Sequence, residues 1–103
     1  MSFVALIEIH LHFPDNHSLK GKRKEVRSLQ AHLQQRFHAS VSETDHHDLW
    51  QRATLSAALV SGDAGVLAEA TTKLERYVWS QYPETSHCDR GMVSSDEVLA
   101  GLL

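Results

Sequence analysis

The clearest pattern in the sequence is an alternation of apolar and polar side chains over residues 3–12. One face would carry Phe3, Ala5, Ile7, Ile9 and Leu11. The other face would carry Val4, Leu6, Glu8, His10 and His12. Since successive side chains of a strand point to opposite faces, this repeat predicts a half-buried β-strand. Residues 14–16, with a proline, end it.

The pattern then changes to a helical repeat. Ser18 is a good N-cap, and a helix from there to about His38 is predicted by apolar residues at helical spacing. These residues are Leu19, Val26, Leu29, Leu33 and Phe37. Residues 61–63 cap a second helix, which Pro83 ends. Its apolar stripe consists of Val66, Leu67, Ala70, Leu74, Tyr77 and Val78.

Three short segments complete the predicted elements. Residues 39–44 and 53–59 alternate and are joined by a polar turn at 45–48, which predicts a hairpin. Residues 85–93 are expected to form the last strand. The order strand, helix, strand, strand, helix, strand predicts an α+β domain of the ferredoxin-like kind. Such a domain carries both helices on one face of a four-stranded antiparallel sheet.

This topology predicts which segments meet. The third strand should lie between the first and the second, antiparallel to both, with right-handed crossovers. The start of the first helix and the turn at 45–48 then lie at one end of the sheet, beside His12 and His17. We expect one domain over residues 1–93 and a tail over residues 94–103, whose leucine-rich spacing suggests a short docking helix.

Composition and the lengths of the apolar runs indicate the expected cellular compartment. Its 103 residues are enough for one domain, and 42% hydrophobic residues with 22% charged residues is typical of globular proteins. No apolar run approaches the roughly 20 residues of a membrane span, and the first strand lacks the flanks of a signal peptide. The lone Cys88 fits a reducing compartment. These features predict a cytoplasmic protein without a membrane partner.

The charge is distributed unevenly. The net charge is -3, but residues 20–38 carry +5, which leaves -8 for the rest of the chain. Lys20, Arg23, Lys24 and Arg27 share one sector of the predicted helix, and such a surface can bind phosphates, although a solvated helix face is the simpler alternative. Lys22 falls in the apolar sector, so its stem should follow the core edge with its ammonium directed to the same end.

Two motifs stand out together: SLKGKR over residues 18–23 and DHHDLWQRA over residues 45–53. With residues 60–63, they resemble the YlxP-like family of small bacterial proteins, also called domain of unknown function 503, over residues 1–93. The resemblance implies a ferredoxin-like fold and no established activity. Genes of the family often neighbour those for translation factors, including ribosome-binding factor A. Gly21 departs from the common pattern, in which an acid would complete a capping box with Ser18.

Trp50 and Arg52 follow the predicted turn. Arg52 could bind a phosphate. Trp50 could stack on a base, or it could close the end of the core, which the general preference of tryptophan for burial favours. The exposed face of the third strand offers Arg52, Thr54, Ser56 and Ala58, which excludes the aromatic reading surface of an RNA-recognition motif.

Metal and catalytic chemistry are not predicted. His10, His12, His17, His46 and His47 could converge at one end, but none has a familiar ligand spacing. The two aspartates of the turn at 45–48 are expected to supply hydrogen bonds and a cap rather than acid-base catalysis. No glycine-rich phosphate loop or nucleophile elbow is present. We therefore expect neither a cofactor nor a catalytic residue.

These observations lead to two hypotheses. The first is a non-enzymatic protein that contacts structured RNA or a ribosomal particle. Its phosphate contacts would be Lys20, Lys22, Arg23, Lys24, Arg27 and Arg52, with Trp50 packing or stacking. The second is a homo-oligomeric interaction module without a nucleic-acid partner, joined through its sheet face, an edge strand or the tail.

Overall fold

The alternating segment forms the central strand of the sheet. The computed structural model describes residues 1–101, in which β1 (Phe3–His12) pairs antiparallel with β3 (Arg52–Ser61) on one side and with β4 (Ser86–Ser94) on the other. The strand order is β2-β3-β1-β4, with β2 (Ser40–Asp45) at an edge. The predicted position of the third strand is therefore confirmed.

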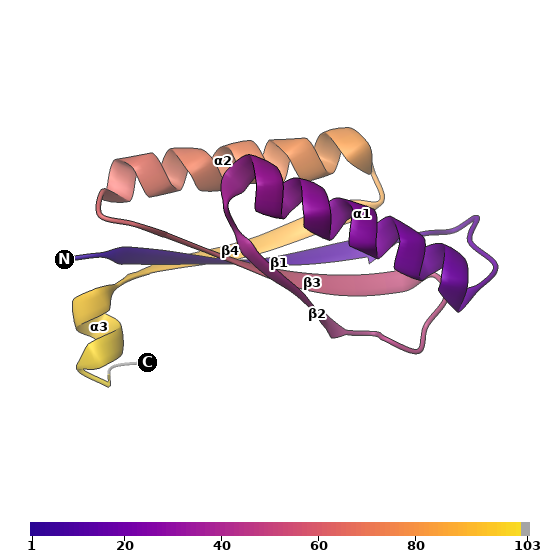
Figure 1. The fold of residues 1–103 in the computed structure, drawn as a ribbon, viewed down its shortest axis with the longest axis horizontal. Coiled ribbons are helices and arrows are strands. Elements are labelled where there is room, and N and C mark those ends of the chain that lie inside the picture. Colours follow the sequence, from indigo (N-terminus) through magenta and orange to yellow (C-terminus); the bar gives the residue numbers. More distant parts are fainter. Residues whose placement is uncertain (102–103) are drawn as a thin grey trace.

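Both long helices cover one face of the sheet (Figure 1). α1 spans Leu19–Phe37 and α2 spans Ala64–Gln81. Each begins at its predicted cap: the Ser18 hydroxyl accepts the Gly21 N–H at 3.0 Å, and the Asp63 carboxylate accepts the Val66 N–H at 2.9 Å. The ferredoxin-like α+β fold predicted from the sequence is confirmed.

The core lies between the sheet and the two helices. Its helical residues are Val26, Leu29 and Leu33 from α1 and Leu67, Leu74 and Val78 from α2. They pack on the buried side chains of β1 and β3. Near the end of β1, Phe13 is buried, and its ring packs against Tyr82 in a T-shaped arrangement at a centroid distance of 5.7 Å. Phe13 therefore closes the core at the end where α1 starts.

That end of the sheet also carries the hairpin, as the topology predicted. His12, the last residue of β1, is directly opposite Arg52, the first residue of β3. The β1–α1 connection, the start of α1 and the β2–β3 connection consequently lie together at one end of the molecule, at the right of Figure 1. The two sequence motifs are thus neighbours in space.

The tail contains a short third helix. α3 (Ser95–Leu99) follows β4 directly and lies near the N-terminus, on the side of the sheet away from α1 and α2 (Figure 1). The Ser95 N–H donates to the Ser2 carbonyl at 2.7 Å, and the Ser2 N–H donates to the Ser95 hydroxyl at 3.0 Å. None of its residues is buried, and Leu99 is 85% exposed. The remaining tail leucines, Leu102 and Leu103, lie outside the described residues.

Candidate functional site

A buried lysine joins the start of α1 to the hairpin. Lys22 is only 1% exposed, and its Nζ donates to the carbonyls of His46 at 2.7 Å and His47 at 3.0 Å. A third bond goes to the carbonyl of Arg52 at 3.2 Å. An ammonium has three hydrogens, so main-chain oxygens use all of them. Glu43 Oε2 lies 3.3 Å from the same Nζ and balances its charge.

This geometry corrects one sequence-based expectation. The Lys22 ammonium is directed to the hairpin end, but it is enclosed there and does not reach the surface, so Lys22 is not one of the phosphate-binding cations. Within residues 1–101, Glu43 Oε2 has no hydrogen-bond partner, because the lysine protons all point to carbonyls. The pair therefore interacts through charge, and Lys22 has a structural role.

Asn16 forms a second link between the two motifs. Its amide Nδ2 donates to the Ser18 carbonyl at 2.7 Å and to the Trp50 carbonyl at 2.5 Å. A Cβ at position 21 would collide with Asn16 Oδ1, whereas the glycine leaves room for this side chain. Gly21, which looked like a missing capping acid, thus permits the contact between Asn16 and the hairpin.

Gln51 completes the attachment of the hairpin. Its carbonyl accepts the Phe13 N–H at 2.8 Å. Its side-chain amide donates to the carbonyls of Pro14 at 3.3 Å and Asn16 at 3.4 Å. The backbone around residue 51 is therefore held against the β1–α1 connection. The neighbouring side chains extend from this fixed backbone.

Four cations line one hollow at the start of α1. This α1 basic surface consists of Lys20, Arg23, Lys24 and Arg27, with Ser18 and Gly21 between them. All four cationic side chains are exposed, and none forms an ion pair or hydrogen bond with any residue between 1 and 101. The expectation that they share one surface agrees with the structure.

Trp50 does not close the core. It is 54% exposed, because Phe13 and Tyr82 already fill that end of the molecule. The prediction of a buried Trp50 was therefore wrong. Burial, together with the 2.9 Å hydrogen bond to Glu25, raises the pKa of the Tyr82 hydroxyl above its usual range. Tyr82 consequently remains a donor and holds the Glu25 carboxylate.

A hydrogen-bonded row of imidazoles crosses the open face of the sheet, and sequence reasoning missed it. Asp89 contacts Nε2 of His10 at 3.2 Å and Nε2 of His87 at 3.0 Å. The Thr54 hydroxyl contacts Nδ1 of His10 at 3.3 Å and Nδ1 of His46 at 3.0 Å. Only the strand register, which sets His10 opposite His87, brings them together. In residues 1–101, no group of three or more His, Cys, Asp or Glu side chains could hold a metal ion.

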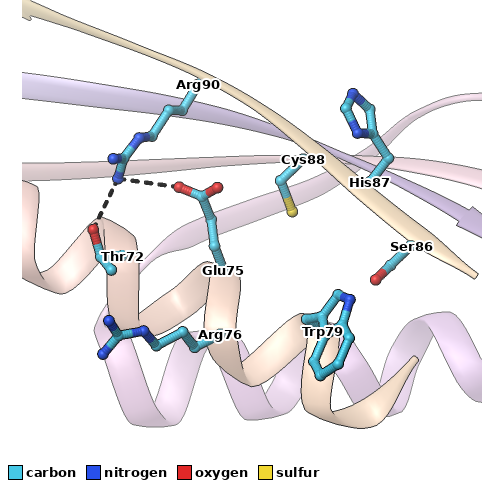
Figure 2. A pocket seen from close by; sticks show the side chains of 8 residues that line it. All are labelled: Thr72, Glu75, Arg76, Trp79, Ser86, His87, Cys88 and Arg90. Atoms are coloured by element: carbon cyan, nitrogen blue, oxygen red, sulfur yellow. Dashed lines mark hydrogen bonds and ion pairs between the residues drawn. The ribbon is translucent and has the colours of Figure 1, made fainter. Parts of the chain in front are cut away.

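A further hollow lies between α2 and β4 (Figure 2). The Arg90 guanidinium there donates to Glu75 and to Thr72, both at 3.1 Å. Burial, with smaller contributions from Glu75 and Asp89, raises the pKa of the Cys88 thiol to about 11. A thiol with such a pKa is protonated near neutral pH and is a weak nucleophile. This hollow therefore presents no activated nucleophile.

The fold recurs in solved structures of diverse proteins. The de novo designed protein Foldit4 has a TM-score of 0.59 and 8% identity, covering 92% of this chain and 99% of that one. The cofactor-independent oxygenase SnoaB from Streptomyces nogalater has a TM-score of 0.50 and 9% identity, covering 90% and 92%. The 30S ribosomal protein S6 from Thermotoga maritima has a TM-score of 0.50 and 8% identity, covering 96% and 94%. At these identities the likeness shows the fold alone.

The family comparison is more specific. No curated protein matches the chain. No helix within residues 1–101 is long and apolar enough to cross a membrane. The family described as "Protein of unknown function (DUF503)" matches residues 4–89, a range that contains both motifs and every residue of the α1 basic surface. The resemblance noted in the sequence is confirmed at this level, and the chain belongs to the DUF503 family.

Proposed function

We propose that the protein is a non-enzymatic, cytoplasmic RNA-binding protein of the translation or ribosome-biogenesis sphere. It contacts structured RNA or a ribosomal particle through the α1 basic surface and the adjoining hairpin. The observation that carries the proposal is the set of four unpaired cations on one hollow of α1. Exposed cations without carboxylate partners attract phosphate and release its counterions on binding.

Three other cations support this proposal by contrast. Lys73 pairs with Glu69 at 3.2 Å, and Arg90 pairs with Glu75 at 3.1 Å. Arg36 lies over the ring of Tyr77, 4.6 Å from its centroid. These cations have partners within the chain, whereas the four of the α1 basic surface have none among the described residues. The α1 basic surface therefore gathers four cations that are free to attract an external anion.

The proposal is tested by co-sedimentation with ribosomal particles. Four neutralised phosphates predict that affinity falls about a hundredfold between roughly 50 and 200 mM salt. The variant with K20E, R23E, K24E and R27E is expected to stay in the supernatant even at the lower salt. Equal binding by wild type and variant, or no binding by wild type, would contradict the proposal.

A matched control separates the effect of the α1 basic surface on binding from the effect of net charge. The double variant R23E/R27E and the double variant K73E/R76E change the net charge equally, but only the first alters the α1 basic surface. We expect weakened sedimentation for the first and near wild-type sedimentation for the second. Equal weakening of both would assign the binding to overall charge.

Self-association is the alternative function, and one observation favours it. The open face is apolar near the start of β1, where Leu6 and Val60 are exposed, Val60 by 71%. This patch lies at the opposite end of the sheet from the α1 basic surface, toward α3 and the N-terminus (Figure 1). Exposed apolar patches of sufficient size are typical of protein interfaces. A second copy of the chain could cover it face to face.

Light scattering distinguishes this alternative. If the patch joins two copies, the wild type is expected to be a dimer and V60D a monomer, because burying an unpaired carboxylate opposes association. V66D is the matched control, since Val66 is also exposed but lies on α2. A wild-type monomer at the highest attainable concentration would remove the alternative.

A further inference from the structure

Two adjacent hollows at the hairpin end share two residues. One is lined by Leu49, Trp50 and Gln51 together with His12 and Arg52. The other is lined by His10, His12, Arg52, Glu84 and His87, among others. His12 and Arg52 are a cross-strand pair at the point where β1 ends and β3 begins. The two hollows therefore form one trough, with an indole in one part and imidazoles in the other.

The aromatic part of the trough is built on a fixed backbone. The carbonyl of Trp50 is held by Asn16, and the next carbonyl, that of Gln51, is held by the Phe13 N–H. The backbone of Trp50 is thus fixed, while its indole is more than half exposed. An exposed indole on a fixed backbone has only its side-chain torsions to order when a flat ligand stacks on it.

The middle of the trough can accept an anion. The side chains of Arg52 and His12 form no hydrogen bond or ion pair with any residue between 1 and 101. His10 and His87, by contrast, are already bound to Asp89. An Arg guanidinium binds phosphate in a bidentate manner, so the free pair beside Trp50 is suited to phosphate.

The trough is continuous with the α1 basic surface. A hollow bordered by Gly21 and Lys24 also includes His12, so it joins the two regions, and Asp15 and Glu25 line it as well. A strand that follows α1 would cross this hollow past Lys24 to reach Arg52 and then Trp50, with the carboxylates of Asp15 and Glu25 opposing its phosphates there. A base inside a duplex is stacked and paired, and it cannot offer its face to Trp50, whereas a base in a single strand or loop can.

We infer that this trough is a subsite for one unpaired nucleotide of RNA. Its base stacks on the indole of Trp50, and its phosphate binds between Arg52 and His12. The inference rests on the proposed function, because the α1 basic surface holds the neighbouring phosphates. It goes further by naming the class of RNA: a single strand or a loop with a flipped-out base, rather than a continuous duplex.

Tryptophan fluorescence tests the inference in the full-length chain. W79F leaves Trp50 as the single tryptophan, and it alters only the exposed ring beside β4. We expect oligoadenylate of about eight nucleotides to quench most of the Trp50 emission. A duplex of the same length is expected to leave the emission nearly unchanged. In the converse variant W50F, where Trp79 is the reporter, oligoadenylate should cause no quenching.

Fluorescence anisotropy of labelled oligoadenylate supplies the affinities. We expect W50A to bind about tenfold more weakly than wild type, since stacking of one base contributes on that scale. R52Q should weaken binding and reduce its salt dependence by about one unit of slope. W50F, which keeps an aromatic ring, should retain most of the affinity.

The outcomes separate this inference from the proposed function. Salt-dependent binding of oligoadenylate without Trp50 quenching, and with equal affinity for W50A, would overturn the nucleotide subsite and leave the basic surface standing. Sedimentation with ribosomal particles but no binding of oligoadenylate would also overturn the nucleotide subsite and leave the basic surface standing. If neither probe binds, both the subsite and the proposed function fail.

Discussion

Replacing Lys22 with methionine is expected to lower the free energy of unfolding by about 3 kcal/mol. The substitution keeps most of the length of the side chain but removes the ammonium that three hairpin carbonyls share. It also leaves the Glu43 carboxylate without its counter-charge, with one oxygen enclosed. Both losses act on groups that folding has removed from water, where an unmatched polar group is costly. Urea unfolding measures the change as a lower midpoint with an unchanged slope.

Two further variants test whether the loss of stability in K22M comes from the buried network around Lys22. Adding E43Q to K22M removes the unmatched negative charge, so the double variant should be more stable than K22M alone. K20M changes the same residue type two positions away on the exposed face, and it should shift stability by less than about 0.5 kcal/mol. A K22M protein that unfolds at the wild-type urea concentration would show that the buried network does not stabilise the fold.

The substitution F13A is expected to destabilise the protein by about 3 kcal/mol, and W50A by less than about 1 kcal/mol. Phe13 is buried and forms a T-shaped pair with Tyr82, so its removal leaves a cavity at the end of the core. Trp50 lies mostly in solvent and fills no part of the core. Parallel urea titrations of the two variants compare the free energies directly.

The order of these two effects is the decisive result. If W50A were the more damaging substitution, Trp50 would close the core, and the nucleotide subsite would lose its aromatic platform. F13L provides the matched control, since a leucine keeps most of the apolar volume and should recover much of the stability that F13A loses.

Periodicity was sufficient to predict the elements and their order. The alternation in residues 3–12 forms β1 over the same residues, and the caps at Ser18 and Asp63 start α1 and α2. These signals are local, because a strand or a helix imposes its own repeat on the sequence. The topology then followed from general rules of chain connection, so the meeting of the two motifs was predictable as well.

The side-chain contacts between the two motifs were predicted only in part. The helical wheel correctly separated Lys22 from the four exposed cations, but it could not show the carbonyls that enclose its ammonium. Those carbonyls belong to an irregular turn, whose path no periodicity describes. The burial of Trp50 was predicted from the average behaviour of tryptophan, and it failed because Phe13, close by in space but not in sequence, already occupies the position.

The imidazole row and the role of Gly21 depend on contacts between distant segments. His10, Thr54 and His87 are adjacent because of register alone, and a shift of one residue would place them on opposite faces. Gly21 is explained by a side chain five positions earlier that turns toward the hairpin. Such contacts leave no periodic trace, so a single sequence cannot reveal them.

Because main-chain oxygens anchor the hairpin, its position does not depend on the side chains that its residues carry. Lys22 binds the carbonyls of residues 46, 47 and 52, and those oxygens are present whatever side chains the three residues carry. The family could therefore exchange these surface residues and acquire a different ligand while the hairpin stays in place. We expect relatives with other residues at 46, 47 and 52 to keep the lysine. One buried side chain would thus make this end of the molecule free to evolve.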